Sequence, residues 1–463
     1  MLDYIFICNF ANEKISTMTL IIVFILLICY VLIATENLTN INKAATAIFA
    51  GTVGWVLYIC YGTNFVMSQH PGEYIDFLDG ASPTSLAVKE YIASNVFLTY
   101  VGRASEIVTF LLATMTIVEI LNNNGCFDFI TQLLKTRSSK KMLWTLTGVT
   151  FLISANLDNL TTTVMMLTMM HQVISNRRQR MVYGSAIVIA ANMGGALTVI
   201  GDPSGLVMWN MGKVTATSLS MSLLLPCLIS CIIPVWWIGR SLPERCDTEW
   251  ITMPYRGNDT RLNVWQRLVM LFVGIGGLWF IPTFHNITQL SPFIGALCVL
   301  AVLWIVNEIF NRKLINADQM TRSRVPGVLQ YGVIQMMLFV MGMMLAIGVV
   351  QETGVTKWLI YEFGQHTKEV WLVAIVSGLI SSVLDNFATA ISFFSLSDAP
   401  LNDQYWKMIA YATAVGGNIL CVGSMSGVAF IKMERIHIGW FFRHVGWMAL
   451  VASLLGLVIL YFS

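Results

Sequence analysis

The chain has 463 residues, of which 56% are hydrophobic and 11% are charged, and its formal net charge is +2 at pH 7. Soluble domains carry about 25% charged residues, so this composition excludes an ordinary soluble enzyme and a disordered chain. The small net charge also excludes a nucleic-acid binder that relies on bulk positive charge. We therefore predict an all-α polytopic membrane protein.

Ten apolar segments have the length that a membrane-spanning helix needs, about 20 residues. They are residues 19–35, 43–62, 93–121, 181–211, 217–239, 264–282, 289–309, 325–350, 405–431 and 440–462. The run 19–35 is interpreted as a membrane anchor and not as a cleaved signal, because the residues before it lack a net positive charge. No role is predicted for residues 1–18.

Two further apolar segments, 142–173 and 370–396, carry Ser, Asn and Asp at their centres. The first is too long for one crossing of the bilayer and too short for two. Basic residues flank it at both ends, whereas acidic residues flank the second, so the positive-inside tendency places the two segments on opposite sides of the membrane. Each is predicted to be a re-entrant hairpin, and both chain termini then lie outside the cytoplasm.

The hairpins belong to an internal repeat. Residues 154–159 (SANLDN) are echoed by residues 381–386 (SSVLDN), and residues 194–201 (GGALTVIG) by residues 416–423 (GGNILCVG). Each half holds five spans and one hairpin, and the halves start on opposite sides, which is the inverted arrangement of secondary transporters with a site at the midplane. The predicted division is a first repeat at 1–239, a cytoplasmic linker at 240–263 and a second repeat at 264–463.

Acidic residues within apolar segments indicate where the chemistry lies. They are Glu106, Glu119, Asp158, Asp202 and Asp385. A charge at the bilayer centre costs about 2.5–3.5 kcal/mol on insertion scales and needs a cation, a proton or a water-filled cavity. Asp158 and Asp385 lie at the hairpin tips, and Asp202 follows a glycine-rich stretch that should break its span. The alternatives are turn caps for the Asp-Asn pairs and close helix packing for the Gly and Ser stretches.

Oxygen atoms freed at hairpin tips and helix breaks suit a small hard cation, whereas a soft metal would need Cys, Met or His. The predicted ligands are Asp158, Asn159, Thr161, Asp202, Ser381, Asp385, Asn386, Ser424 and Ser426. Glu106 and Glu119 are predicted to form a proton path along one span. The alternative is that Glu106 pairs with Arg103 and that Glu119 lies near the inner end of the span. No catalytic residue and no cofactor are expected.

These residues resemble those of a known family. The similar segments are residues 117–119, 154–163, 190–195 with 200–202, and 384–386. They look like motifs of the NhaD-type sodium/proton antiporters of the ion transporter superfamily. The chain departs from this pattern at Thr198-Val199, where the family tends to have Ser-Pro, and after Asn386, where no proline follows.

The resemblance implies a homodimer in which a domain that bears the hairpins moves against a scaffold. It also implies functional roles for Asp158, Asn159, Thr161, Asp202, Ser381, Asp385, Asn386 and Ser424.

The expected function is exchange of Na⁺ or Li⁺ for H⁺ across the cytoplasmic membrane, which serves pH homeostasis. Cation and protons compete for the same carboxylates, so exchange is obligatory. One alternative is a carrier of a dicarboxylate or oxyanion, or a sodium-coupled symporter, although carboxylates at the hairpin tips would repel an anion. A remote alternative is an intramembrane aspartyl protease that uses Asp158 and Asp202, which leaves Asp385 and the duplication without a role.

Overall fold

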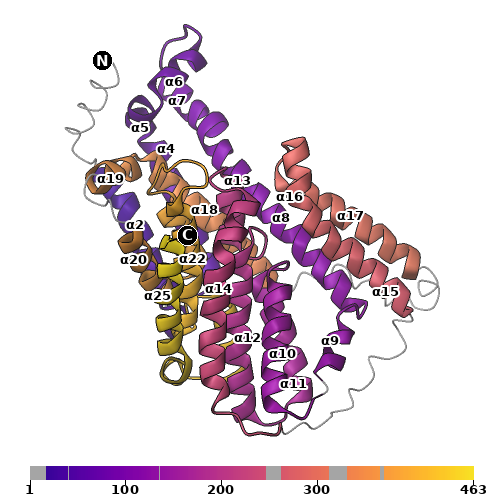
Figure 1. The fold of residues 1–463 in the computed structure, drawn as a ribbon. Helices are drawn as coiled ribbons and strands as arrows, with labels where there is room; N and C mark the ends of the chain where they lie inside the picture. Colours follow the sequence, from indigo (N-terminus) through magenta and orange to yellow (C-terminus); the bar gives the residue numbers. More distant parts are fainter. Residues whose placement is uncertain are drawn as a thin grey trace. The chain divides into compact units, whose positions relative to one another are not determined.

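The computed structural model describes residues 17–39, 41–134, 136–246, 262–311, 331–364 and 370–462. Within these ranges the regular secondary structure is helical, and no strand is present. The predicted all-α membrane fold is therefore confirmed (Figure 1). Residues 1–16, most of the predicted linker 240–263 and the start of the predicted span 325–350 lie outside the described residues.

Nine helices in the described ranges are long and apolar enough to cross a membrane. They are Thr17–Ala34, Lys43–Cys60, Ser85–Asn123, Ala216–Gly239, Val264–Thr288, Pro292–Asn311, Ile334–Glu352, Gln404–Glu434 and Ile438–Phe462. Each corresponds to one of the ten predicted spans. The tenth, 181–211, forms two shorter helices, α12 (Arg177–Leu197) and α13 (Pro203–Asn210), because the chain breaks between them.

The chain divides into two compact units, and each unit takes segments from both predicted repeats. Unit 1 holds Met1–Val108, Ile334–Glu369 and Ile391–Asp398. Unit 2 holds Thr109–Val333, Val370–Ala390 and Ala399–Ser463.

The elements of unit 1 are α2 (Thr17–Ala34), α3 (Glu36–Thr39), α4 (Lys43–Cys60), α5 (Gly62–Gln69), α6 (Pro71–Leu78), α7 (Ser85–Tyr91), η1 (Ile92–Phe97), the start of α8 (Leu98–Asn123), α18 (Tyr331–Glu352) and α19 (Val355–Gly364).

Helices of unit 1 pack closely through small residues. Gly51 of α4 lies against Gly342 of α18, where a side chain on either glycine would meet the backbone of the other helix. Small residues let membrane helices approach in this way.

An imidazole held between two carboxylates connects α6 to the end of α18 in unit 1. His70 Nε2 lies 2.7 Å from Glu352 Oε2, and His70 Nδ1 lies 3.1 Å from Glu73 Oε2. Tyr100 donates to Glu352 at 2.8 Å, and Tyr91 donates to Glu73 at 3.0 Å. Only the imidazolium donates from both nitrogens, and the hydrogen bond with Glu352 raises the pKa of His70 above its usual value.

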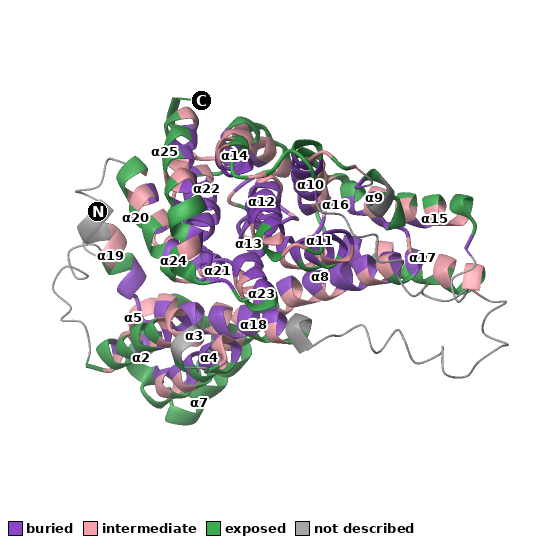
Figure 2. Cartoon of the chain, turned by 90° about the horizontal axis from the view of Figure 1, so that it is seen from below, coloured by how far each residue is buried: buried purple, intermediate pink, exposed green. Residues whose placement is uncertain are grey.

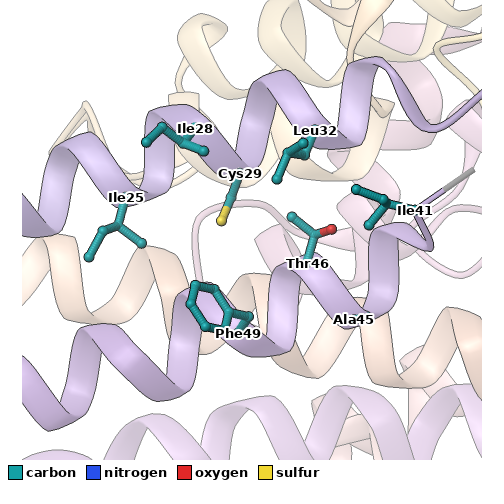
Figure 3. Close-up of a pocket in the computed structure, with 8 residues that line it drawn as sticks. All are labelled: Ile25, Ile28, Cys29, Leu32, Ile41, Ala45, Thr46 and Phe49. Carbon is teal, nitrogen blue, oxygen red and sulfur yellow. The ribbon is translucent and has the colours of Figure 1, made fainter. Parts of the chain in front are cut away.

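A groove between α2 and α4 in unit 1 is lined by apolar side chains (Figure 3). Ile25, Leu32 and Phe49 point into it, together with Cys29 and Thr46. None of the residues that line this groove is charged, so the groove offers no carboxylate to a cation.

Unit 2 is built around two long helices that are buried along most of their length, α12 and α22 (Gln404–Leu420), as Figure 2 shows. The first hairpin, α10 (Ser139–Ser154) and α11 (Asn159–Val173), packs on α12, and α20 (Val370–Val383) of the second hairpin packs on α22. The second hairpin continues into α21 (Asn386–Phe394), which belongs to unit 2 as far as Ala390. The remaining elements are the end of α8, α9 (Asp128–Leu133), α13, α14 (Ala216–Gly239), α15 (Val264–Leu271), η2 (Phe272–Gly276), α16 (Gly277–Thr288), α17 (Pro292–Asn311), α23 (Met425–Glu434), α24 (Ile438–Phe441), η5 (Phe442–Gly446) and α25 (Trp447–Phe462).

Each arm of the two hairpins is shorter than a membrane span. Helices α10 and α11 have 16 and 15 residues, and α20 and α21 have 14 and 9. At 1.5 Å per residue the longest arm extends about 24 Å, against an apolar thickness of about 30 Å. The re-entrant course of the hairpins through the bilayer stays a prediction.

A buried carboxylate in unit 2 connects the end of α11, the start of α12 and the end of α23. The Glu434 side chain is 1% exposed, and its Oε1 lies 3.1 Å from Arg180 Nε and 2.7 Å from His171 Nε2. Arg177 donates to the backbone carbonyl of Glu434. These contacts hold the second arm of the first hairpin to α23.

Candidate ion-binding site

The tip of the first hairpin is attached to the break between α12 and α13. Ser154 Oγ donates to the carbonyl of Ala191 at 2.6 Å, and the backbone amide of Asn159 donates to the carbonyl of Gly201 at 3.2 Å. The end of α10 and the start of α11 are therefore both held to the broken helix.

The second hairpin makes the same two contacts with the break between α22 and α23. Ser381 Oγ donates to the carbonyl of Thr413 at 2.6 Å, and the amide of Asn386 donates to the carbonyl of Gly423 at 2.8 Å. Residues that are equivalent in the predicted repeat thus have equivalent partners. The hydroxyl of Ser381, a predicted ligand, is used as a donor to the backbone.

Asp202 lies between the two hairpin tips. It is the N-cap of α13, where its Oδ2 accepts the amide of Ser204 at 3.1 Å and also the Ser204 hydroxyl. Its Oδ1 accepts Asn159 Nδ2 of the first tip at 2.8 Å and Asn386 Nδ2 of the second tip at 3.2 Å. Only 3% of Asp202 is exposed. Residues from three separate segments therefore meet at one buried carboxylate.

The tip residues Asp158 and Asp385 are also buried. Asp158 is the N-cap of α11, and its Oδ2 accepts the amide and the hydroxyl of Thr161 at 2.8 and 2.9 Å. Its Oδ1 has no hydrogen-bond partner among the described residues. Asp385 Oδ1 accepts the amide of Phe387 at 3.0 Å. Asp158 thus has a buried carboxylate oxygen that is available to a further ligand.

At the break between α22 and α23, the Ser424 hydroxyl occupies the position that the Asp202 carboxylate has at the break between α12 and α13. Ser424 is the N-cap of α23, and its Oγ accepts the amide of Gly427 at 3.1 Å. Asn192 of α12 donates to Ser424 Oγ at 2.9 Å and to Asn418 Oδ1 at 2.8 Å. Ser426 is fully buried, and its hydroxyl has no partner in the described part of the chain.

The electrostatics of this region favour a proton or a small cation. The described hydrogen bonds to Asp158 and Asp202 come from amides and hydroxyls, and none comes from Lys or Arg. A buried carboxylate without a cationic partner is unstable unless it takes up a proton or a cation. Carboxylate, amide and hydroxyl oxygens together suit a hard cation.

A model of the citrate transporter family, CitMHS, matches residues 10–416. The chain belongs to this family. It is therefore a multi-pass membrane transporter. The chain is similar to Sodium/proton antiporter 1 of Arabidopsis thaliana, at 30% identity over 82% of the chain and 64% of that relative. It is also similar to Sodium/proton antiporter 2 of the same plant, at 31% identity over 77% of the chain and 85% of the relative.

A bacterial relative shares less of its sequence with this CitMHS protein. It is the Na(+)/H(+) antiporter NhaD of Vibrio parahaemolyticus, which is 26% identical over 75% of the chain and 87% of the relative. The resemblance to NhaD-type antiporters that the motifs indicated is therefore confirmed.

Two residues of the site in this CitMHS protein were missed by the sequence prediction, Asn192 and Asn418. Both are buried amides on the long helices that precede the breaks, and both are 1% exposed. Asn192 lies two residues before the first Gly-Gly pair, and Asn418 directly follows the second. A buried Asn beside paired glycines in an apolar helix was the available signal.

The two glutamates of the predicted proton path both lie on α8. Glu106 belongs to unit 1 and Glu119 to unit 2, and both side chains are half-buried. Their role in proton movement stays a prediction.

Proposed function

We propose that this CitMHS protein exchanges Na⁺ for H⁺ across the cytoplasmic membrane, with Li⁺ as a substitute for Na⁺. The names of its relatives from Arabidopsis thaliana and Vibrio parahaemolyticus support this function. The observation that carries the proposal is Asp202, a buried carboxylate that accepts hydrogen bonds from the asparagines of both hairpin tips. A site that joins both hairpin tips to one carboxylate can couple ion binding to the positions of the tips.

Competition for the carboxylates accounts for exchange. When Na⁺ is bound between Asp202 and the unpartnered Oδ1 of Asp158, protonation of either carboxylate weakens the attraction that holds the ion. Conversely, a bound Na⁺ disfavours protonation. Asn159 and Asn386 supply amide oxygens to the ion while their Nδ2 atoms stay on Asp202. The site is then occupied by either Na⁺ or protons, and alternate exposure to the two sides couples their gradients.

The proposed ligands are the nine residues that the sequence analysis names, with a changed role for Ser381. Its hydroxyl hydrogen is used on the Thr413 carbonyl, so we assign Ser381 to holding the tip, with only its oxygen lone pairs available to an ion. The transported ions are Na⁺ or Li⁺ and H⁺, and the proposal requires no cofactor.

The mechanism is proposed to operate in a homodimer of inverted repeats, 1–239 and 264–463, with both termini outside the cytoplasm. The matched contacts of Ser154 and Ser381 support the repeat. Alternating access follows from inverted repeats that exchange conformations about a central site.

Transport of an organic anion is the second candidate, and the family description, citrate transporter, favours it. A polycarboxylate needs cationic partners, most often Arg in paired geometry. The described partners of Asp158 and Asp202 are neutral, so the charge of the site supports a cation instead.

A gradient assay in liposomes distinguishes the two candidates. Purified protein is reconstituted with a pH-sensitive dye, a proton gradient is imposed, and NaCl, LiCl, KCl or choline chloride is added. We expect Na⁺ and Li⁺ to collapse the gradient and choline to leave it unchanged. Sodium citrate should have no effect beyond that of its sodium. A gradient that Na⁺ leaves intact, or that collapses only with citrate, would overturn the proposal.

A pair of Asp→Asn variants then tests the site. Asp158→Asn keeps the cap of α11 but removes the charge, and it should abolish the Na⁺ response. Asp403→Asn is the matched control, because Asp403 caps α22 through the amide of Tyr405 at 2.8 Å and is not among the proposed ligands. Wild-type flux in Asp158→Asn would show that this carboxylate is not a ligand.

A further inference from the structure

Thr198 is the C-cap of α12, at the start of the break that leads to α13. Its hydroxyl donates to the carbonyl of Ala155 in the first hairpin tip at 2.5 Å, and it accepts the amide of Gly201 at 3.1 Å. One side chain thus connects the tip to both sides of the break. We propose that Thr198 is a positioning residue that sets the cation affinity of the site, an inference that rests on the proposed function.

The Thr198 hydroxyl forms hydrogen bonds with two backbone groups that have no partner within α10 or α13. Ala155 is the C-cap of α10, where carbonyls have no partner within the helix, and Gly201 precedes the first turn of α13. Both residues are buried, so water is not a ready substitute. A hydroxyl has one donor and two acceptor positions, and Thr198 uses both kinds at once.

Loss of the Thr198 hydroxyl would affect the Asp202 carboxylate through two further hydrogen bonds of the same junction. The carbonyl of Gly201 accepts the amide of Asn159, and the Asn159 side chain donates to Asp202, which directly follows Gly201. If Thr198 no longer holds Gly201 and the tip together, Asn159 and Asp202 shift relative to each other. Its two described hydrogen bonds go to backbone groups and not to a proposed ligand side chain, so it acts through position.

The break between α22 and α23 has no side-chain hydroxyl at the position equivalent to Thr198. In the aligned repeat, Leu420 occupies the place of Thr198 and has no hydroxyl. The next residue, Cys421, instead adopts a left-handed backbone with φ of 63°. The two half-sites are therefore closed in different ways, and only the first depends on a side-chain hydroxyl at this position.

Three variants separate positioning from general stability. Thr198→Val has nearly the same shape but lacks the hydroxyl, and Thr198→Ser restores it. Thr150→Val is the matched control, because Thr150 is fully buried in α10 and its hydroxyl donates to Leu146 of the same helix at 2.6 Å. The control removes a buried hydroxyl from the same hairpin without disturbing the junction.

The measurement is the concentration of NaCl that half-saturates thermal stabilisation of the purified protein, with choline chloride keeping the ionic strength constant. Loss of a buried hydrogen bond changes an equilibrium constant by about tenfold, so we expect Thr198→Val to need about tenfold more Na⁺. Thr198→Ser and Thr150→Val should stay within about twofold of the wild type.

An unchanged half-saturating concentration in Thr198→Val would overturn the inference, even if its melting temperature falls. An equal shift in Thr150→Val would overturn it as well. If Na⁺ stabilises the wild type but does not collapse a proton gradient, the proposed exchange fails while the role of Thr198 in Na⁺ binding stands. Absence of any Na⁺ stabilisation in the wild type would overturn both.

Discussion

Gly201 lies where the first hairpin tip touches the broken helix, and no side chain fits there. A Cβ built on Gly201 would lie 2.5 Å from the carbonyl oxygen of Ser154 and 2.8 Å from Cα of Gly195. We expect Gly201→Ala to push the tip away by about 0.5 Å, because close-packed interiors do not absorb such contacts. Overpacking of this kind costs about 1–3 kcal/mol.

The same displacement should weaken ion binding. The hydrogen bond from the Asn159 amide to Gly201 is already 3.2 Å long, so a further shift takes it beyond hydrogen-bond range. Asn159 then no longer holds Asp202 in place. We therefore expect both a lower melting temperature and a reduced Na⁺ flux in liposomes.

Gly148→Ala is the matched control for this prediction. Gly148 lies within α10 of the same hairpin, and a Cβ there meets nothing within 4 Å. Replacing an unconstrained helical glycine by alanine stabilises by about 0.5–1 kcal/mol, so the melting temperature should rise or stay unchanged. Thermal unfolding in detergent measures the melting temperatures of both variants, which are expected to change in opposite directions. Equal melting temperatures in Gly201→Ala and Gly148→Ala would refute the close approach of tip and break.

Three further predictions concern charged residues. Asp202→Asn keeps a good N-cap but removes a negative charge. At about 4 Å and an effective dielectric constant of about 20, that charge contributes about 4 kcal/mol to the free energy of Na⁺ binding, so the Na⁺ affinity measured by flux should weaken roughly 1000-fold. Because the hydrogen bond with Glu352 raises the pKa of His70, the stability that this contact contributes is full below about pH 6.5 and is lost as pH rises through the folded-state pKa. Thermal unfolding scanned across pH should show that loss in the wild type and not in His70→Gln. Glu434→Gln leaves Arg180 without its buried counter-ion and should lower stability by about 3 kcal/mol in thermal unfolding.

Each of these predictions has a control and an outcome that contradicts it. Asp403→Asn should keep wild-type flux, and an Asp202→Asn protein with Na⁺ affinity within tenfold of the wild type contradicts the charge argument. A His70→Gln protein that loses stability with rising pH as the wild type does contradicts the ion-pair argument. Asp128→Asn breaks an exposed pair with Arg267 and should cost less than about 1 kcal/mol; an effect as large as that of Glu434→Gln contradicts the burial argument.

Composition and local pattern were sufficient for the membrane fold, because an apolar run long enough to cross a bilayer is a local property. In the described part of the chain, nine of the ten predicted spans correspond to helices long and apolar enough to cross a membrane, although Gln404–Glu434 is interrupted between α22 and α23. The glycines and proline around Asp202 also located the break in the tenth, since these residues interrupt a helix through their own backbone chemistry. Buried acidic residues were recognised for a similar reason, because a charge in an apolar segment needs an explanation wherever it lies.

The partners of those acidic residues were decided only by tertiary structure. Asn159 and Asn386 lie far apart in the chain, yet both donate to the same oxygen of Asp202. Ser381, a predicted ligand, donates its hydroxyl to the carbonyl of Thr413 and so holds a hairpin tip, while Asn192, which carried no predicted role, bridges Asn418 and Ser424. Hydrogen bonds between distant segments depend on how helices pack, and no local pattern of residues encodes that geometry.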